Sequence, residues 1–582
     1  MRSFFKMFFA SLLSLIIFSV LAFFILVGLA ATLTKKSKPD IAGKSVLVID
    51  LSKDYKEFAI ESPLNAFSEE TDIPSLYELT RLIRHAKTDN NISGIYLIAD
   101  NNSNGAASNN EIRRALLDFK TAKKFIIAHG DVMSQSAYFV ASAADKVYVN
   151  PTGIFEWYGY SVTLPFLKGT LEKLDIQPQI FYAGKFKSAT EIFRTDKMTP
   201  ENKLQTTVMV NNMYGYFLNS VAASRHLDTA TLRQLANTAA IQTPSDALKA
   251  GLIDAVKYDD QVKTEVKDRL RIGKYDKLNL VSISKYNEAV DLVKTGSDRI
   301  AVIYAEGDIV DGEGTPQNIG GESFRAMIRK ARLDKRVKAI VLRVNSGGGS
   351  ALASEIMWRE LQMAKLEDKK PVVVSFGDVA ASGGYYISCG ADSIFCNPNT
   401  ITGSIGVFGI IPNMQNFFKS KLGVTFDGVT TSPYADMGVL KPLDERQKQI
   451  IQSSIERMYG QFKQRVADGR KKGVAYIDSI AQGRVWTGWD ALQIGLVDRL
   501  GNLDDAIACA ARMAKISDYG IKEYPETEGW LQTLLNKKKS EPEAIIKEKL
   551  GAEYYRTYQQ VMKIKEMSNS VQARLPYEII FN

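Results

Sequence analysis

The sequence predicts an α/β protein made of two tandem copies of one domain, with an apolar helix in front of them. The first observation behind this prediction is an internal repeat. Three segments recur at an offset that drifts only from 245 to 247 residues, and a fourth pair sits at 244. A period this long indicates whole domains rather than a solenoid. The matched segments are 93–100 with 338–345, 131–145 with 378–392, 150–159 with 397–409, and 243–254 with 487–498.

The second observation is the alternation of strand and helix patterns inside the second copy. Short apolar runs rich in β-branched residues alternate with amphipathic stretches, and in residues 351–368 the apolar side chains share one helical stripe. Continuous apolar strands that alternate with helices indicate a largely parallel sheet covered on both faces. The predicted strands are 300–305, 339–344, 372–376 and 393–396.

The third observation is the N-terminus. Residues 7–34 form an uncharged run of 28 residues with basic residues on both sides. About 20 apolar residues span a bilayer as a helix, whereas the apolar part of a cleaved signal peptide is usually about 7–15 residues long. We therefore predict a membrane anchor with residues 8–33 in the bilayer. Because both flanks are basic, charge alone does not set its orientation.

These observations divide the chain into five parts. Residues 1–38 are the predicted anchor with its flanks, and residues 45–256 are the first repeat. Residues 257–298 form a bridging segment that leads to the second repeat at 299–510. Residues 511–582 form a C-terminal extension, which is predicted to be helical because its Lys/Glu-rich sequence favours helix.

Composition narrows the possible functions. The net charge of +9 is spread along the chain, and no zinc-finger spacing, aromatic-basic RNA motif or polybasic arm occurs, which argues against nucleic acid as a partner. Three cysteines without a CxxC pair indicate neither a disulfide framework nor a metal site, and we expect no cofactor. The three histidines all lie at or before His226, so the second copy lacks a histidine base.

Glycine-rich turns occur only in the second copy. Residues 345–350, NSGGGS, directly follow a predicted strand and precede a predicted helix. Glycines there leave backbone N–H groups open to an anion, either a phosphate or the oxyanion of an acyl-transfer intermediate. The Gly-Lys-Ser/Thr ending of a phosphate-binding loop and the GxGxxG pattern are both absent. The alternative interpretation is a tight structural turn.

Ser404, in the second such turn TGSIG, is the candidate nucleophile. The first copy keeps the surrounding Asn-Pro and a following glycine, but it has Trp157 at the matching position. The alternative is a serine that only caps a helix. A serine needed only as a cap would not separate the two copies so sharply, so we expect this residue to carry chemistry.

A serine nucleophile needs a base, and the neutral amine of lysine is the known substitute for histidine. Residues 182–193 of the first copy supply Lys185 and Lys187 in an apolar setting, whereas the corresponding residues 426–438 contain no lysine. The loss of serine from one copy and of lysine from the other indicates one composite site between the copies. By itself, a pair of lysines usually belongs to a solvated surface.

Five segments together carry a family resemblance: LRVNSGGGS, AASGGYYIS, NPNTITGSIGVFG, YAGKFKSATE and QARLPY. With them the chain resembles, over essentially its whole length, the long form of the signal peptide peptidase A family, whose repeats have a ClpP/crotonase-like fold. The resemblance implies Ser404 as nucleophile, Lys187 rather than Lys185 as general base, and the backbone N–H of Gly348 as an oxyanion donor. The family's turn usually has proline where this chain has Gly347.

The resemblance also implies a biological setting. The expected protein is a homotetramer anchored in the bacterial inner membrane, with its catalytic part facing the periplasm. Its expected substrates are cleaved signal peptides and other short hydrophobic peptides. Lys187 must be neutral to accept a proton, and burial between the copies is what would lower its pKa.

Three alternatives remain open. A crotonase-type acyl-CoA enzyme would share the fold and the backbone oxyanion site, but it usually adds an acidic residue that neither glycine-rich turn supplies. Ser382, in AASGG, is the residue that the similar motif of Clp-type proteases suggests as nucleophile, but those proteases need a downstream histidine. A non-catalytic membrane scaffold would have no reason to retain TGSIG and Lys187.

Overall fold

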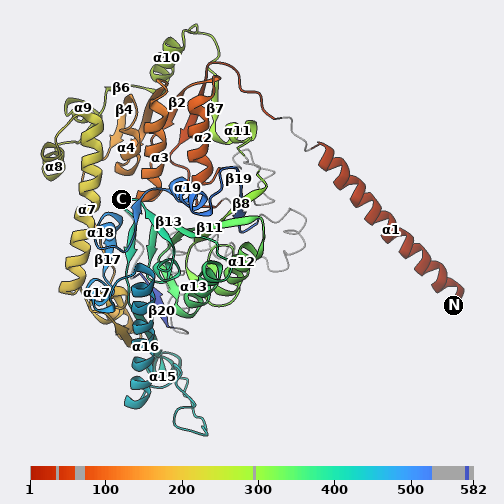
Figure 1. Cartoon of the computed structure of the whole chain (residues 1–582), viewed down its shortest axis with the longest axis vertical. Coiled ribbons are helices and arrows are strands. Elements are labelled where there is room, and N and C mark those ends of the chain that lie inside the picture. The colour runs from red at the N-terminus through yellow and green to blue at the C-terminus, as the bar shows by residue number, and fades with distance from the viewer. Residues whose placement is uncertain (1, 34–37, 59–72, 293–295, 527–570, 576–582) are drawn as a thin grey trace.

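The computed structural model describes residues 2–33, 38–58, 73–292, 296–526 and 571–575. Helix α1 (Arg2–Leu33) stands apart from the rest of the chain in Figure 1, and apolar side chains on it such as Phe8 and Phe18 are exposed. Among the helices in these ranges, none combines the length and the apolar character needed to cross a membrane. The anchor on residues 8–33 stays a prediction.

The first repeat is built on a six-stranded sheet in the order β6-β4-β3-β2-β1-β7, with parallel pairing throughout. Apolar side chains fill both faces of the sheet, which is why its central strands are continuous apolar runs. Strand β7 comes from the predicted bridging segment and completes the edge beside β1. The strands are β1 (Ser45–Asp50), β2 (Ile92–Ile98), β3 (Phe125–Met133), β4 (Lys146–Phe155), β6 (Ala255–Val256) and β7 (Leu280–Ser282). The helices are α2 (Leu76–Thr88), α3 (Ala106–Lys120), α4 (Gln135–Ala141), α7 (Pro200–Arg225), α8 (Thr229–Asn237), α9 (Pro244–Lys249), α10 (Asp259–Leu270) and α11 (Ile283–Ala289).

The second repeat holds an eight-stranded sheet in the order β17-β15-β13-β11-β8-β19, with β14 pairing β13 and β18 pairing β14. Every pairing is parallel except that of β15 with β17. The two sheets confirm the predicted α/β architecture. The strands are β8 (Asp298–Glu306), β11 (Val337–Ser346), β13 (Val372–Ala381), β14 (Ser393–Cys396), β15 (Ile401–Gly403), β17 (Val485–Thr487), β18 (Arg499–Leu500) and β19 (Tyr519–Tyr524). The helices are α12 (Gly321–Leu333), α13 (Ala351–Leu366), α14 (Gly383–Ser388), α16 (Glu445–Arg470), α17 (Val474–Ile480), α18 (Gly488–Gln493) and α19 (Leu503–Ala514).

Within the described part of the C-terminal extension, residues 511–514 are helical as the end of α19, whereas the strands that follow differ from the predicted helix. Strand β19 joins the second sheet beside β8, and residues 571–575 carry a further strand, β20 (Gln572–Arg574). Pairing partners at the edge of an existing sheet outweigh local propensity here. The remainder of the predicted helical part, at 527–570 and 576–582, lies outside the described residues.

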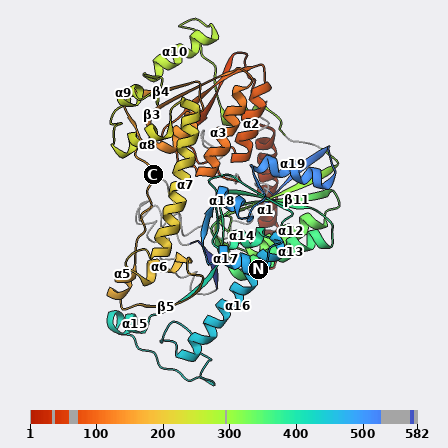
Figure 2. The ribbon, with the colours of Figure 1, turned by 60° about the vertical axis from the view of Figure 1, so that its left-hand side comes forward.

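A third sheet joins the two repeats, in the order β10-β9-β12-β20-β16-β5. Strand β5 belongs to the first repeat and pairs antiparallel with β16 of the second repeat over seven residue pairs. This pairing places the residues that follow β5 beside the second repeat. Helix α7 runs along both repeats (Figures 1 and 2). The remaining elements are β5 (Gln177–Ala183), β9 (Ile309–Val310), β10 (Ile319–Gly320), β12 (Gly348–Ser350), β16 (Val407–Asn413), α5 (Lys168–Lys173), α6 (Glu191–Arg194) and α15 (Gln415–Leu422).

A buried ionic cluster links the two repeats. Arg343 of β11 contacts Glu57 at 2.9 Å and Glu111 of α3 at 2.8 Å, and all three side chains are buried. Burial raises the pKa of both carboxyl groups, and the guanidinium opposes that rise. Asp378 of β13 accepts a 2.7 Å bond from the Ala107 N–H in the first turn of α3. Because a buried charge without its partner is costly, these contacts favour one relative position of the repeats.

Candidate active site

Lys187 reaches the second repeat through a tight turn that follows β5. The Lys187 N–H donates to the Gly184 carbonyl at 3.1 Å, and the Phe186 N–H donates to the Gln482 carbonyl at 2.8 Å. Gly184 has a φ of +104°, in the region that favours glycine. A Cβ placed on Gly483 would stand only 2.6 Å from the Lys187 Cβ. The turn is therefore pressed against the second repeat.

The amine of Lys187 lies between two serine hydroxyls. Its Nζ is 2.8 Å from the Ser382 Oγ and 3.0 Å from the Ser404 Oγ, and it also contacts the Ser404 carbonyl at 3.2 Å. The Lys187 side chain is fully buried, and this burial holds the pKa of its amine well below the usual lysine value. The amine is thus poised to be neutral and to exchange a proton with either serine.

Ser382 occupies a strained turn between strand and helix. It follows β13 directly and precedes α14, and it has φ +54° and ψ −113°, a conformation that a residue with a Cβ rarely adopts. The Ser382 N–H donates to the Gly403 carbonyl at 2.8 Å. A sharp strand-to-helix turn of this kind presents a nucleophilic serine at the end of a sheet in other hydrolase folds.

Ser404 lies between β15 and β16, with its N–H donating to the Arg484 carbonyl at 2.7 Å. It also has a positive φ, of +51°. Both its hydroxyl and its carbonyl face the Lys187 amine. The structure thus brings the two residues predicted from the sequence together, although they are 217 positions apart in the chain.

Lys185 takes no part in this arrangement. Its side chain is exposed, and its Nζ lies 5.4 Å from the centre of the Phe186 ring. Both lysines lie in the turn that follows β5, and Lys187, two residues farther along, is buried against the second repeat. The choice of Lys187 over Lys185, which the family resemblance implied, agrees with this geometry.

Gly348, the predicted oxyanion donor, lies next to the residue that follows Ser382. A Cβ placed on Gly348 would stand 2.6 Å from the Gly383 backbone nitrogen. Gly348 has a φ of +99°, so glycine is favoured there on conformational grounds as well. Its N–H donates to the Ser346 Oγ at 3.1 Å in this structure. A bound carbonyl oxygen would have to compete with that hydroxyl.

Sequence reasoning did not place Ser382 beside Lys187. The signal was present in AASGG, where small residues surround a serine between a strand and a helix. The absence of a downstream histidine counted against it, but the Lys187 amine that it contacts comes from the other repeat. Within the described ranges no three His, Cys, Asp or Glu side chains gather as a metal site requires. Cys389, Cys396 and Cys509 are free and buried.

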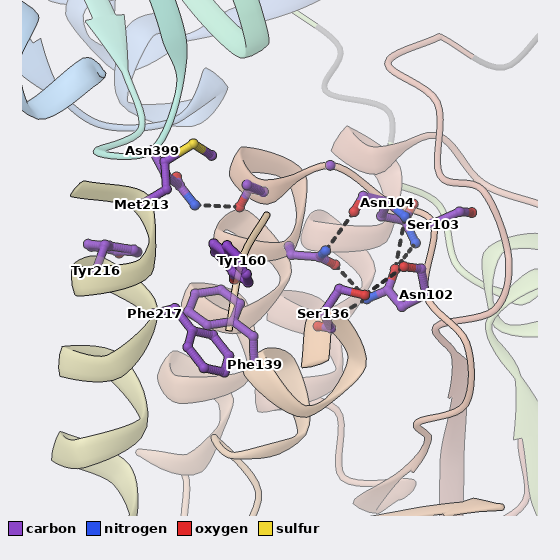
Figure 3. A pocket seen from close by; sticks show the side chains of 13 residues that line it. Asn102, Ser103, Asn104, Ser136, Phe139, Tyr160, Met213, Tyr216, Phe217 and Asn399 are labelled. Carbon is purple, nitrogen blue, oxygen red and sulfur yellow. Dashed lines mark hydrogen bonds between the residues drawn. The ribbon is translucent and has the colours of Figure 1, made fainter. Parts of the chain in front are cut away.

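The first repeat has a pocket where the second has this site. A cavity of about 170 Å³ lies between the loop that follows β2, the start of α4, and α7. Figure 3 shows asparagine side chains of the loop on one side, aromatic rings such as Tyr160 on the other, and Asn399 entering from the second repeat. The loop amides bond to one another, as Asn102 does to Asn109 at 2.8 Å. No lysine lines this pocket.

Several known proteins are similar to this chain. The model of Peptidase family S49 matches twice, at residues 118–272 and 364–517, once in each repeat. "Protease 4" of Salmonella typhi is 38% identical, over 88% of this chain and 84% of that protein. "Serine protease SPPA, chloroplastic" of Arabidopsis thaliana is 34% identical, over 76% of this chain and 66% of that protein. Among solved structures, a mutant of ClpP1 from Listeria monocytogenes matches with a TM-score of 0.25 and 16% identity, over 35% of this chain and 94% of that chain.

Proposed function

The chain belongs to peptidase family S49 and is a serine peptidase, and we propose that it works with a Ser–Lys pair shared between its two repeats. The observation that carries this proposal is the buried Lys187 amine within hydrogen-bonding distance of two serine hydroxyls. A neutral amine can accept a serine proton, whereas an ammonium group cannot. The lowered pKa of Lys187 supports the neutral form. The alternatives of an acyl-CoA enzyme and of a scaffold fall away with family membership.

We propose Ser382 as the nucleophile and Ser404 as the residue that holds the lysine. Ser382 contacts the amine, and its strained backbone lies at a strand-to-helix turn, where other hydrolase folds place a nucleophilic serine. Ser404 offers the amine both a hydroxyl and a carbonyl, which suits a positioning role. The assignment of Ser404 as nucleophile, made from the sequence, is the second candidate, because its hydroxyl is also within reach of Lys187.

The reaction follows from these positions. Lys187 takes the proton from the Ser382 hydroxyl as its Oγ attacks the peptide carbonyl carbon. The backbones of Gly383 and Gly348 lie side by side, and we assign their N–H groups to the oxyanion that forms. Lys187 then gives its proton to the departing amine, and an acyl-enzyme on Ser382 remains. Water, deprotonated by the same lysine, then attacks the ester, and the lysine returns this proton to the Ser382 oxygen as the acyl–oxygen bond breaks and the acid product leaves.

An active-site label tests this assignment. A fluorophosphonate reacts with an activated serine and leaves a phosphonyl group on its oxygen. We expect peptide mapping by mass spectrometry to place that group on Ser382 and not on Ser404, and we expect the Lys187→Ala variant to remain unlabelled. An adduct on Ser404 in the wild type would restore the sequence-based assignment.

We further propose that the protein is a homotetramer in the bacterial inner membrane, with its site facing the periplasm, and that it degrades cleaved signal peptides and other short hydrophobic peptides. The long uncharged run at residues 7–34 and the exposed apolar side chains of α1 support an anchor. In a flotation assay, binding of the protein to lipid vesicles should require residues 8–33. Light scattering of the detergent-solubilised protein should give the mass of four copies. The protein should also degrade synthetic signal-peptide fragments. Full vesicle binding after deletion of residues 2–33 would contradict the anchor.

A further inference from the structure

A buried glutamine of the first repeat holds the turn that carries Lys187. Gln205 lies in α7, and its side chain is fully buried. Its Nε2 donates to the Phe186 carbonyl at 3.1 Å and to the Ser188 Oγ at 3.0 Å. These two acceptors belong to the residues that directly precede and follow Lys187. One amide group therefore holds the chain on both sides of the proposed base.

The same amide group also bonds to the second repeat. The Gln205 Oε1 accepts the Val485 N–H at 3.2 Å. Val485 of β17 pairs with Gly403 of β15, the residue before Ser404. The Gly403 carbonyl in turn accepts the Ser382 N–H at 2.8 Å. Gln205 thus ties the lysine turn to the strand pair from which both serines are positioned.

A buried carboxylate sets the orientation of this amide. Glu191, which begins α6 after the lysine turn, accepts the Asn202 Nδ2 at 2.8 Å and the Thr199 Oγ1 at 2.6 Å. Figure 2 shows α6 beside the start of α7, which carries Asn202. Because the Asn202 Nδ2 faces a carboxylate, its Oδ1 faces Gln205 and accepts the Gln205 Nε2 at 3.3 Å. The Gln205 Oε1 is therefore left to face the second repeat.

The proposed base needs such support because its side chain is long and flexible. The hydrogen bonds of the Lys187 amine go to Ser382 and Ser404, and burial keeps its pKa low. If the turn relaxed, the amine would reach water, where the ammonium form is favoured, and its pKa would rise toward the usual lysine value. A misplacement of about 1 Å in a catalytic group can also slow a reaction by about 10²-fold.

We propose that Gln205 is a positioning residue, which keeps the Lys187 amine buried and within reach of the serine hydroxyls. This inference rests on Lys187 as the base in the proposed function, and it holds whichever of the two serines reacts. It also gives α7 a part in the reaction, since this helix supplies the only side chain described here as bonding to both the lysine turn and β17.

Gln205→Met tests the proposal, because it keeps the approximate length of the side chain and removes its donor and its acceptor. We expect kcat for peptide hydrolysis, per folded molecule, to fall by about 10- to 100-fold, with KM within about twofold of the wild type. The acid midpoint, meaning the pH at which kcat/KM falls to half on the acid side, should move up by about half a pH unit or more. The upward direction follows because a less buried amine is protonated more easily.

Gln135→Met is the matched control. Gln135 is also a buried glutamine of the first repeat, and its Oε1 also accepts backbone N–H groups, but those belong to Tyr158 and Gly159 and not to the lysine turn. We expect this variant to lose stability as Gln205→Met does, while its acid midpoint coincides with that of the wild type. Chemical denaturation gives the folded fraction of each sample.

Ser188→Ala gives a second, milder variant, which decides the question if Gln205→Met does not fold. It removes one acceptor of the Gln205 amide, so we expect the same upward move of the acid midpoint with a loss in kcat of about three- to tenfold. An acid midpoint that coincides with the wild type would overturn the inference whatever the loss in kcat, because a packing defect alone does not change the ionisation of the base. If Lys187→Ala keeps wild-type activity, the proposed function fails instead, so the two failures are distinguishable.

Discussion

The same place in the two repeats has opposite chemical character. In the second repeat, Ser382 and Ser404 both contact the Lys187 amine. By the offset of the internal repeat, their counterparts in the first repeat are Gln135 and Trp157. Those two side chains bond to the backbone of their own repeat instead. In the proposed reaction the first repeat still contributes, because its Lys187 amine lies between the two serine hydroxyls.

In the first repeat, Gln135 and Trp157 make structural hydrogen bonds at the positions that match the two serines. The Gln135 Oε1 accepts bonds from the Tyr158 and Gly159 N–H groups at 3.0 and 2.9 Å. The Trp157 indole donates to the Leu232 carbonyl at 3.0 Å and is fully buried. Side chains that do not have to contact a substrate can make all their hydrogen bonds within the protein and pack against their neighbours. In the second repeat the two serine hydroxyls contact the Lys187 amine, whereas in the first repeat the matching side chains bond to backbone groups. The comparison teaches that the proposed site depends on side chains that bond to one another and not to the backbone.

Replacement of the shared lysine should have the largest effect. Lys187→Ala leaves both serines without a base, and Lys187→Arg supplies a group that stays protonated. We expect each to lower kcat/KM for a peptide substrate by roughly 10³-fold or more. Lys185→Ala, two residues away and exposed, is the matched control and should stay within about twofold. Substantial activity in Lys187→Ala would show that the site is not shared between the repeats.

Replacing each of the two serines by alanine should lower activity to a different extent. Ser382→Ala should match the loss in Lys187→Ala, since both remove the same step. Ser404→Ala should lower kcat by about 10- to 100-fold, because the amine loses one of its two hydroxyl partners but keeps Ser382. It should also move the pH profile, which a purely structural change would leave in place. The reverse order of the two losses would make Ser404 the nucleophile.

The pH profile follows from the buried amine. The pKa of Lys187 is lowered by burial, and only the neutral amine accepts the serine proton. Activity should therefore be lost as pH falls through that depressed pKa, by about tenfold per pH unit, and kcat/KM should level off above it. The Lys185→Ala profile should coincide with the wild type. A profile that is flat down to the range where carboxyl groups titrate would exclude Lys187 as the base.

The internal repeat made much of this comparison predictable. Offsets in the sequence located the α/β repeats and pointed to Lys185 and Lys187 through the missing lysine in the counterpart, and the family resemblance selected Lys187. The contact of Ser382 with the Lys187 amine could not be predicted, because it depends on backbone angles and on atoms brought together from distant segments. Strand β20 was also missed, since a three-residue strand is defined by the edges it pairs with rather than by its own pattern.

The smallest effect on activity should come from the first-repeat counterpart of Ser382. Gln135→Ala removes a buried acceptor from two backbone N–H groups, so we expect a loss of about 2 kcal/mol in the free energy of unfolding. The folded protein should keep kcat/KM within about twofold, because no reacting group touches Gln135. Ser382→Ala is the matched variant and should show the opposite pair of results, namely lost activity with nearly unchanged stability. Chemical denaturation followed by fluorescence, together with peptide hydrolysis on the same samples, measures both quantities. Lost activity in Gln135→Ala at unchanged stability would mean that the first-repeat pocket takes part in the reaction, and the division of labour between the repeats would have to be redrawn.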